Sequence, residues 1–190
     1  MSTFFIPNAL TVGRLLAIPF VLYLLLRTPE TPEFRYYAVL ILVVQQLSDV
    51  LDGYLARRIK RRIGGENRFG AILDPVADKL FVWSTFVALS ATFGFPWWIT
   101  LTILGKDVFL LSGWLLRARL YGIRTVRPNF FGKAADSLQA FFIFAFLLQI
   151  PARILNVWTV VMVLFTVLAG VIYFVVGFRE ISKVGTRHTA

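Results

Sequence analysis

Four aspartates lie close together along the sequence, and long apolar runs flank them. They are Asp49, Asp52, Asp74 and Asp78. A carboxylate in an apolar, membrane-like segment is costly unless a cation holds it, so residues of this kind indicate a functional site. Their chemistry suits a divalent metal ion, because carboxylate oxygens are the ligands that such ions prefer.

Helical spacing gathers these carboxylates into two pairs. Asp49 and Asp52 are three residues apart and therefore share one face of a helix. On the same face, the small residues Gly53 and Ala56 leave room for a bulky ligand. The second pair is spaced four residues apart and shares a face of another helix. Two such helices packed together predict an all-oxygen cage suited to Mg²⁺, Mn²⁺ or Ca²⁺.

The chain that must position these residues has the composition of a helical membrane protein. Hydrophobic residues make up 58% of its 190 positions, and apolar stretches long enough to cross a bilayer alternate with short polar connections. We expect an all-α integral membrane protein with six transmembrane helices. The expected spans cover about 9–26, 36–59, 97–116, 134–150 and 155–178, and the third begins near residue 69.

Basic residues predict how this chain lies in the membrane. Most of the 20 Lys and Arg residues follow the second, fourth and sixth spans, and such clusters mark the cytoplasmic side. We therefore expect a multi-pass protein of the inner (cytoplasmic) membrane, with both termini and the aspartate site on the cytoplasmic side. The positive charge fits anionic lipid headgroups better than it fits nucleic acid, so no nucleic-acid partner is expected.

A carboxylate cage beside basic residues at a membrane surface suits an anionic substrate that is partly lipid. Divalent ions can bridge two phosphates and neutralise the charge that builds on a transferred group, which favours phosphoryl-group chemistry on a pyrophosphate-linked lipid. The chain has no Cys, and its one histidine, His188, lies in the basic tail. A covalent enzyme intermediate is therefore not expected, and an aspartate can take the proton from an attacking hydroxyl.

These acidic segments resemble the signature of the CDP-alcohol phosphotransferase family, in which D-x-x-D-G-x-x-A-R is followed by G-x-x-x-D-x-x-x-D. This chain supplies Asp49, Asp52, Gly53, Ala56, Arg57, Gly70, Asp74 and Asp78 in that order. The spacer between Arg57 and Gly70 is longer than is usual in that family. The resemblance implies one domain over residues 1–190 and an enzyme of phospholipid biosynthesis. Such an enzyme moves the phosphatidyl group of CDP-diacylglycerol to an alcohol and releases CMP.

The resemblance also implies roles for individual residues. Two divalent ions, Mg²⁺ or Mn²⁺, would be bound by Asp49, Asp52, Asp74 and Asp78, and Asp78 would be the general base. The residues implied around the nucleotide are Asn8, Thr11, Arg14, Asp49, Gly53, Ala56, Arg57 and Gly70. A homodimer is implied as well.

The alcohol acceptor is predicted from weaker features. The opening Asn8, Leu10, Thr11 and Arg14 resembles the phosphatidylglycerophosphate synthase branch, which favours glycerol 3-phosphate. Lys106-Asp107 is instead similar to the cardiolipin synthase branch, in which CDP-diacylglycerol reacts with phosphatidylglycerol. Glycerol 3-phosphate is the expected acceptor, and a cardiolipin synthase is the alternative. The residues expected to bind the acceptor phosphate are Lys106, Arg117, Arg119 and Lys133.

Position along the chain leaves several alternatives open. Arg14 either binds an anion or extends to the headgroups, and Lys106 either contributes to an anion site or pairs internally with Asp107. The aspartates themselves would also suit a divalent-cation transporter, although a transporter site should lie near the middle of the bilayer. In the remaining interpretation, the aspartates are purely structural and form ion pairs with neighbouring arginines.

Overall fold

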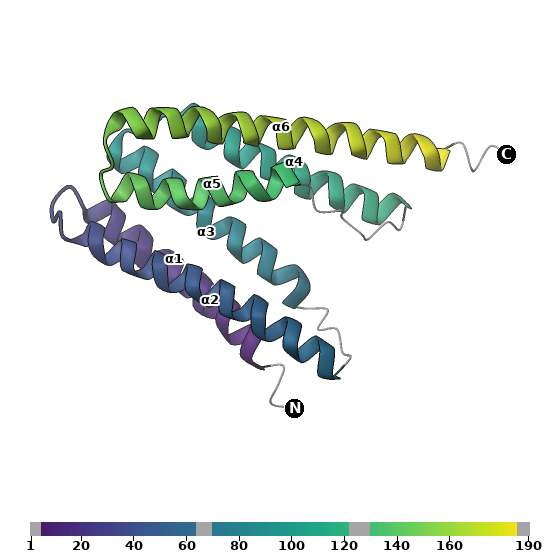
Figure 1. The fold of residues 1–190 in the computed structure, drawn as a ribbon, viewed down its shortest axis with the longest axis horizontal. Helices are drawn as coiled ribbons and strands as arrows, with labels where there is room; N and C mark the ends of the chain where they lie inside the picture. Colours follow the sequence, from purple (N-terminus) through teal and green to yellow (C-terminus); the bar gives the residue numbers. More distant parts are fainter. Residues whose placement is uncertain (1–4, 64–69, 122–129, 186–190) are drawn as a thin grey trace. The chain divides into compact units, whose positions relative to one another are not determined.

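The computed structural model describes residues 5–63, 70–121 and 130–185, which form helices and the short turns between them (Figure 1). Side chains are described for residues 13–48, 76–113, 119 and 130–177. The helices are α1 (Phe5–Arg27), α2 (Phe34–Ile63), α3 (Gly70–Phe93), α4 (Trp97–Tyr121), α5 (Phe130–Leu147) and α6 (Ala152–Gly185). The described part of the chain confirms the expected all-α class.

Several helices extend beyond the expected spans. α2 continues to Ile63 through a run of basic residues, and α6 continues to Gly185. Hydropathy marks where a chain leaves the apolar layer of a membrane, whereas the helical hydrogen bonds continue into the aqueous phase for as long as no helix breaker intervenes. The two helices therefore continue past the expected ends of the membrane spans at residues 59 and 178, and the span ends themselves stay predictions.

The chain forms two compact units, Met1–Phe95 and Pro96–Ala190. In the first unit, α1 packs against both α2 and α3. Its core contains fully buried apolar side chains from all three helices, including Leu25 of α1, Ala38 of α2 and Leu89 of α3. Gly94, whose φ is 70°, follows the end of α3, and glycine adopts this left-handed conformation without steric cost.

In the second unit, α6 packs against both α4 and α5. Buried polar side chains join α5 and α6, because Gln139 Nε2 donates a hydrogen bond of 3.1 Å to Thr166 Oγ1. Nearby, Gly132 permits a close approach: a Cβ at this position would lie 3.2 Å from the ring of Tyr173. These contacts hold α5 tightly against α6.

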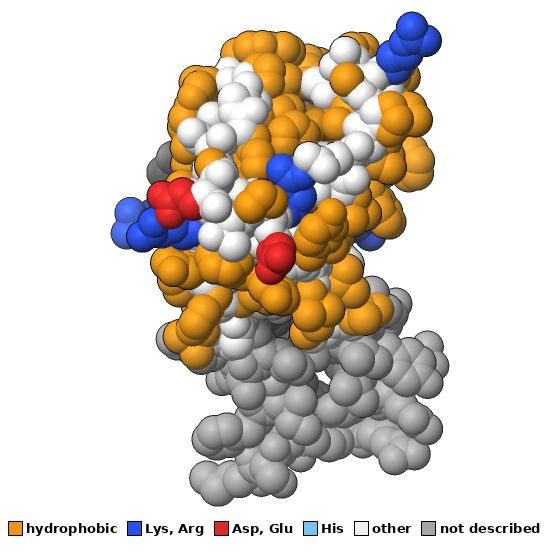
Figure 2. Space-filling view, turned by 90° about the vertical axis from the view of Figure 1, so that its left-hand side faces the viewer, with side chains coloured by type: hydrophobic (Ala, Val, Ile, Leu, Met, Phe, Trp, Pro, Cys, Tyr) orange, Lys and Arg blue, Asp and Glu red, His pale blue; other side chains and the backbone are white. Residues whose placement is uncertain are grey.

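Among the residues whose side chains are described, three helices contain segments long and apolar enough to cross a membrane, namely Val76–Phe93, Phe130–Leu147 and Ala152–Gly177. Only 17% of the α6 segment is buried, compared with 39% of each of the other two. Hydrophobic side chains cover most of the described surface in Figure 2, with a few charged groups among them. A large exposed apolar surface, together with these segments, is typical of a membrane protein, while the full set of six spans stays a prediction.

Candidate active site

The two aspartate pairs lie on α2 and α3 of the first unit. Asp49 and Asp52 occupy the second half of α2, and Asp74 and Asp78 occupy the first turns of α3. The C-terminal end of α2 and the N-terminal end of α3 lie at the same end of this unit (Figure 1). Only residues 64–69 separate the two helices along the chain, so the topology brings the acidic segments towards one another.

Helix α1 lies against both of these helices and carries the third predicted group. Asn8, Thr11 and Arg14 are in its first half, and its N-terminal end lies at the same end of the unit as the acidic segments (Figure 1). Arg14 is only 9% exposed. An arginine that reached the headgroups would expose its guanidinium, so its burial favours a role inside the protein.

The described side chains include one of the four aspartates. Asp78 is exposed, whereas its neighbour Ala77 is 1% exposed, which places the carboxylate on the accessible side of α3. The other predicted residues on α2 and α3 have their backbone in these helices, but their side chains lie outside the described part: Asp49, Asp52, Gly53, Ala56, Arg57, Gly70 and Asp74. The side chains of Asn8 and Thr11 also lie outside it.

Three of the four side chains of the predicted metal cage, those of Asp49, Asp52 and Asp74, lie outside the described part of the structure. Within the described part of the structure, no group of three or more His, Cys, Asp or Glu side chains is arranged to hold a metal ion. The cage therefore stays a prediction. The fold places four hard oxygen donors on two helices whose acidic segments lie at the same end of the first unit.

A second charged cluster lies in the second unit, around Lys106. Its Nζ lies 2.9 Å from Asp136 Oδ1 on α5 and 3.0 Å from Asp107 Oδ1 on α4. The side chains of Lys106 and Asp107 are 4% and 1% exposed, and that of Asp136 is 46% exposed. Burial makes the charges of Lys106 and Asp107 dependent on their partners. The internal ion pair is therefore the favoured interpretation of Lys106.

Sequence reasoning did not identify Asp136 as a partner of Lys106. Asp136 lies near the start of α5, where the helix dipole already accounts for a negative charge. In the sequence, Lys106 itself indicated that an anionic partner exists, because a lysine inside an apolar span needs an anion. Unlike the buried side chain of Lys106, those of Arg119 and Lys133 are exposed. The side chain of Arg117 lies outside the described part.

Comparison with known proteins decides the family. A model of the CDP-alcohol phosphatidyltransferase family matches residues 4–173. The chain belongs to the CDP-alcohol phosphatidyltransferase family. This confirms the resemblance expected from the aspartate signature, and the match runs through both compact units.

Relatives within the family carry both of the expected names. The chain is 33% identical over 187 residues to a probable phosphatidylglycerophosphate synthase of Mycobacterium tuberculosis, which covers 96% of the chain and 85% of the relative. It is 36% identical over 159 residues to a CDP-diacylglycerol–glycerol-3-phosphate 3-phosphatidyltransferase of Pectobacterium atrosepticum, over 80% of the chain and 81% of the relative. It is 40% identical over 134 residues to a cardiolipin synthase (CMP-forming) of Streptomyces coelicolor, over 68% of the chain but only 59% of the relative.

Proposed function

We propose that this protein transfers the phosphatidyl group of CDP-diacylglycerol to glycerol 3-phosphate and releases CMP. The observation that carries this proposal is the family signature on α2 and α3, whose acidic segments lie at the same end of the first unit. Two relatives named for this reaction match most of the chain. The protein would then be a phosphatidylglycerophosphate synthase.

Transfer would proceed in one displacement. An oxygen of the alcohol attacks the phosphorus that bears the diacylglycerol, the bond from that phosphorus to CMP breaks, and CMP leaves. Asp78, which is exposed on α3, accepts the proton of the attacking hydroxyl. The small residues Gly53, Ala56 and Gly70 leave space for the nucleotide.

Basic and polar residues on the three helices would orient the nucleotide. Arg57 on α2 and Arg14 on α1 supply positive charge beside its phosphates. Asn8 and Thr11 lie on the same helix as Arg14 and would bind polar groups of the nucleotide. The burial of Arg14 supports this role, because a buried guanidinium is an effective partner for a phosphate in a site from which water is excluded.

Two divalent ions, Mg²⁺ or Mn²⁺, would be held by Asp49, Asp52, Asp74 and Asp78. The donor set fits, because all four side chains offer the carboxylate oxygens that these ions prefer. Bound there, the ions would neutralise the pyrophosphate and the charge that develops on the transferred group.

The acceptor phosphate would be bound by basic residues of the second unit. Arg119 and Lys133 are exposed and free to reorient, and Arg117 lies two residues before Arg119. Lys106 can bind a phosphate only by leaving Asp107 and Asp136, so we place it behind the other three residues in this role.

A cardiolipin synthase, with phosphatidylglycerol as acceptor, is the second candidate. Lys106-Asp107 favours it, as does the likeness to the Streptomyces coelicolor protein, which is named a cardiolipin synthase (CMP-forming). For either reaction we propose a homodimer in the inner membrane, with six spans and with both termini and the active site on the cytoplasmic side.

One assay separates these functions. Purified protein in detergent is given CDP-diacylglycerol with glycerol 3-phosphate, phosphatidylglycerol or inositol phosphate, and CMP and the lipid product are measured with and without a chelator. Chelator-sensitive CMP release with glycerol 3-phosphate supports the proposal, and release only with phosphatidylglycerol supports the second candidate. Metal flux into liposomes without turnover of any CDP-lipid would instead indicate a transporter.

A further inference from the structure

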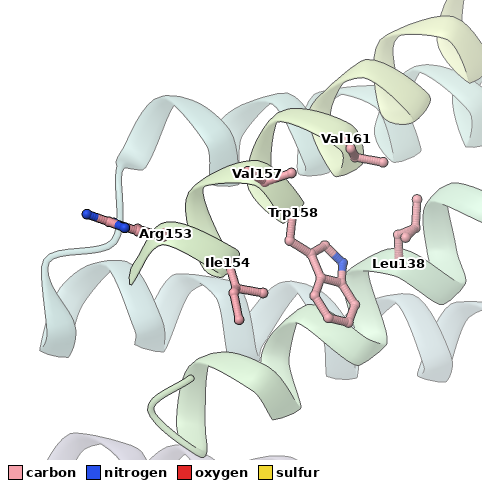
Figure 3. Close-up of a pocket in the computed structure, with 6 residues that line it drawn as sticks. All are labelled: Leu138, Arg153, Ile154, Val157, Trp158 and Val161. Atoms are coloured by element: carbon pink, nitrogen blue, oxygen red, sulfur yellow. The ribbon is translucent and has the colours of Figure 1, made fainter. Parts of the chain in front are cut away.

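A hydrophobic groove runs between α5 and α6 of the second unit. It is lined by Leu138, Arg153, Ile154, Val157, Trp158 and Val161. Its volume is about 540 Å³, within the range of about 300–1,000 Å³ that is typical of sites for small ligands. Figure 3 shows the indole of Trp158 extending from α6 into the space beside Leu138 of α5, and Arg153 at the start of α6 with its guanidinium directed away from the other five side chains.

Trp158 has a polar group that lacks a partner. Its indole Nε1 is buried, and no acceptor for it is found among the described residues. A buried indole N–H usually donates a hydrogen bond, and an unsatisfied buried donor in a native structure requires an explanation. An occupant of the groove that offers an oxygen would provide the missing acceptor. Because the indole nitrogen is covered, the indole has to turn towards the mouth of the groove before it can donate a hydrogen bond to this oxygen.

Arg153 supplies a charge at the end of the groove. It is exposed, and no ion pair involves it within the described part of the chain. The apolar segments of α5 and α6 end at Leu147 and begin at Ala152, respectively. The turn between these segments therefore lies at the level of the lipid headgroups, and Arg153 is placed where a headgroup phosphate would be.

We propose that this groove binds one anionic phospholipid of the surrounding bilayer. The phosphate contacts Arg153, an acyl chain lies along Ile154, Val157 and Val161, and an oxygen of the lipid accepts the hydrogen bond of Trp158. Lipid binding at this site requires neither the enzymatic reaction nor any of the predicted active-site residues. The proposal can therefore be tested independently of the proposed function.

A second copy of the chain fits the groove less well. In a two-fold symmetric dimer whose axis runs along the groove, residues close to the axis face their own counterparts, so the two Arg153 guanidinium groups would lie at the same level and repel each other. The segment of α6 that lines the groove is also the least buried of the three apolar segments. A surface of this kind with a single cation at its end matches a lipid with an apolar chain and a negative headgroup.

The test uses tryptophan fluorescence of the full chain in bilayers of phosphatidylcholine. Brominated phosphatidylglycerol or brominated phosphatidylcholine is added as a quencher, and the contribution of Trp158 is obtained by subtracting the signal of the Trp158→Phe variant. One favourable charge contact predicts about fivefold stronger quenching by the anionic lipid. Arg153→Gln should remove this preference, whereas Arg27→Gln, at an exposed arginine of the first unit, should retain it.

A second variant tests the groove itself. Val157→Phe places a large ring on the lining of the groove and should weaken the quenching of Trp158 by both lipids, while the thermal stability stays close to that of the parent protein. Equal quenching by the two lipids in the parent protein would overturn the proposal. An unchanged preference in Arg153→Gln, or cross-linking of two chains through a cysteine placed at residue 157, would also overturn it.

Discussion

Lys106 Nζ lies 2.9 Å from Asp136 Oδ1, so an ion pair joins α4 to α5 within the second unit. The hydrocarbon part of Lys106 also reaches α6, because a Cβ built on Gly170 would lie 3.9 Å from Lys106 Cγ. Lys106, which lies on α4, is thus close to both α5 and α6. Its charge is shared between Asp136 and the almost fully buried Asp107.

The first prediction concerns the stability of this cluster. Lys106→Met should lower the unfolding free energy by about 3–5 kcal/mol, because the buried carboxylate of Asp107 loses its cation. Asp136→Asn should cost about 1 kcal/mol or less, since that carboxylate is 46% exposed. Thermal unfolding in detergent measures both effects. The double variant Lys106→Met with Asp107→Asn should recover part of the loss, and a loss equal to that of Lys106→Met alone would contradict this account.

The second prediction concerns Asp78. Asp78→Asn should reduce CMP release from CDP-diacylglycerol by on the order of 10²-fold to 10⁴-fold, the usual contribution of a general base. The variant should keep the stability of the parent protein, because Asp78 is exposed. Glu33→Gln removes an exposed carboxylate from the turn between α1 and α2 and serves as the matched control with unchanged activity. Full activity of Asp78→Asn would exclude Asp78 as the base.

The sequence was informative about the helices and less so about their ends and partners. Apolar runs predicted all six helices, because burial in a bilayer demands both hydrophobicity and internal backbone hydrogen bonds. The fifth span was predicted to run to about Ile150, whereas α5 ends at Leu147. The apolar pattern continues there, while the backbone turns at Gln149. Likewise, Lys106 signalled the need for an anion, but only the packing of α4, α5 and α6 selects Asp136.

The candidate active site was predictable for a different reason. The spacing of the aspartates depends only on helical periodicity, and it places the residues of each pair on one face without knowledge of the fold. The burial of Arg14 was not predictable in this way, because an arginine early in an apolar span can extend to the headgroups. It depends on the packing of α1 against both α2 and α3.

The third prediction concerns the turn after α5. Gln149 has a φ of 56°, and the N–H groups of Gln149 and Ile150 bond to the carbonyls of Phe146 and Ala145. This is the hydrogen-bond pattern of a helix end at which glycine is favoured. Gln149→Gly should therefore raise the unfolding free energy by about 1 kcal/mol, since the left-handed conformation no longer strains a side chain. Gln149→Ala keeps the Cβ and should give no such gain in the same thermal unfolding measurement.

The fourth prediction uses the hydrogen bond between Gln139 and Thr166. Both side chains are buried, and the hydroxyl of Thr166 also donates to the Met162 carbonyl at 2.7 Å. Thr166→Val leaves the amide of Gln139 without this acceptor and should cost about 1–3 kcal/mol. Gln139→Leu leaves Thr166 with its other partner and should cost less, about 0.5–1.5 kcal/mol. Thermal unfolding of the two variants should show this order, and the reverse order would mean that Gln139 finds another acceptor.

The fifth prediction tests whether the buried arginine of α1 serves the nucleotide. Arg14→Gln and Arg14→Lys should both raise the KM for CDP-diacylglycerol at least tenfold. Neither glutamine nor lysine can reproduce the bidentate contact of a guanidinium with a phosphate. The KM for the alcohol acceptor should change little, because the acceptor is expected at other residues. If Arg14 only stabilises the packing of α1, Arg14→Lys would instead lower the thermal stability while leaving the KM for CDP-diacylglycerol unchanged. Measuring both quantities on the same two variants separates binding of the nucleotide from support of the helix.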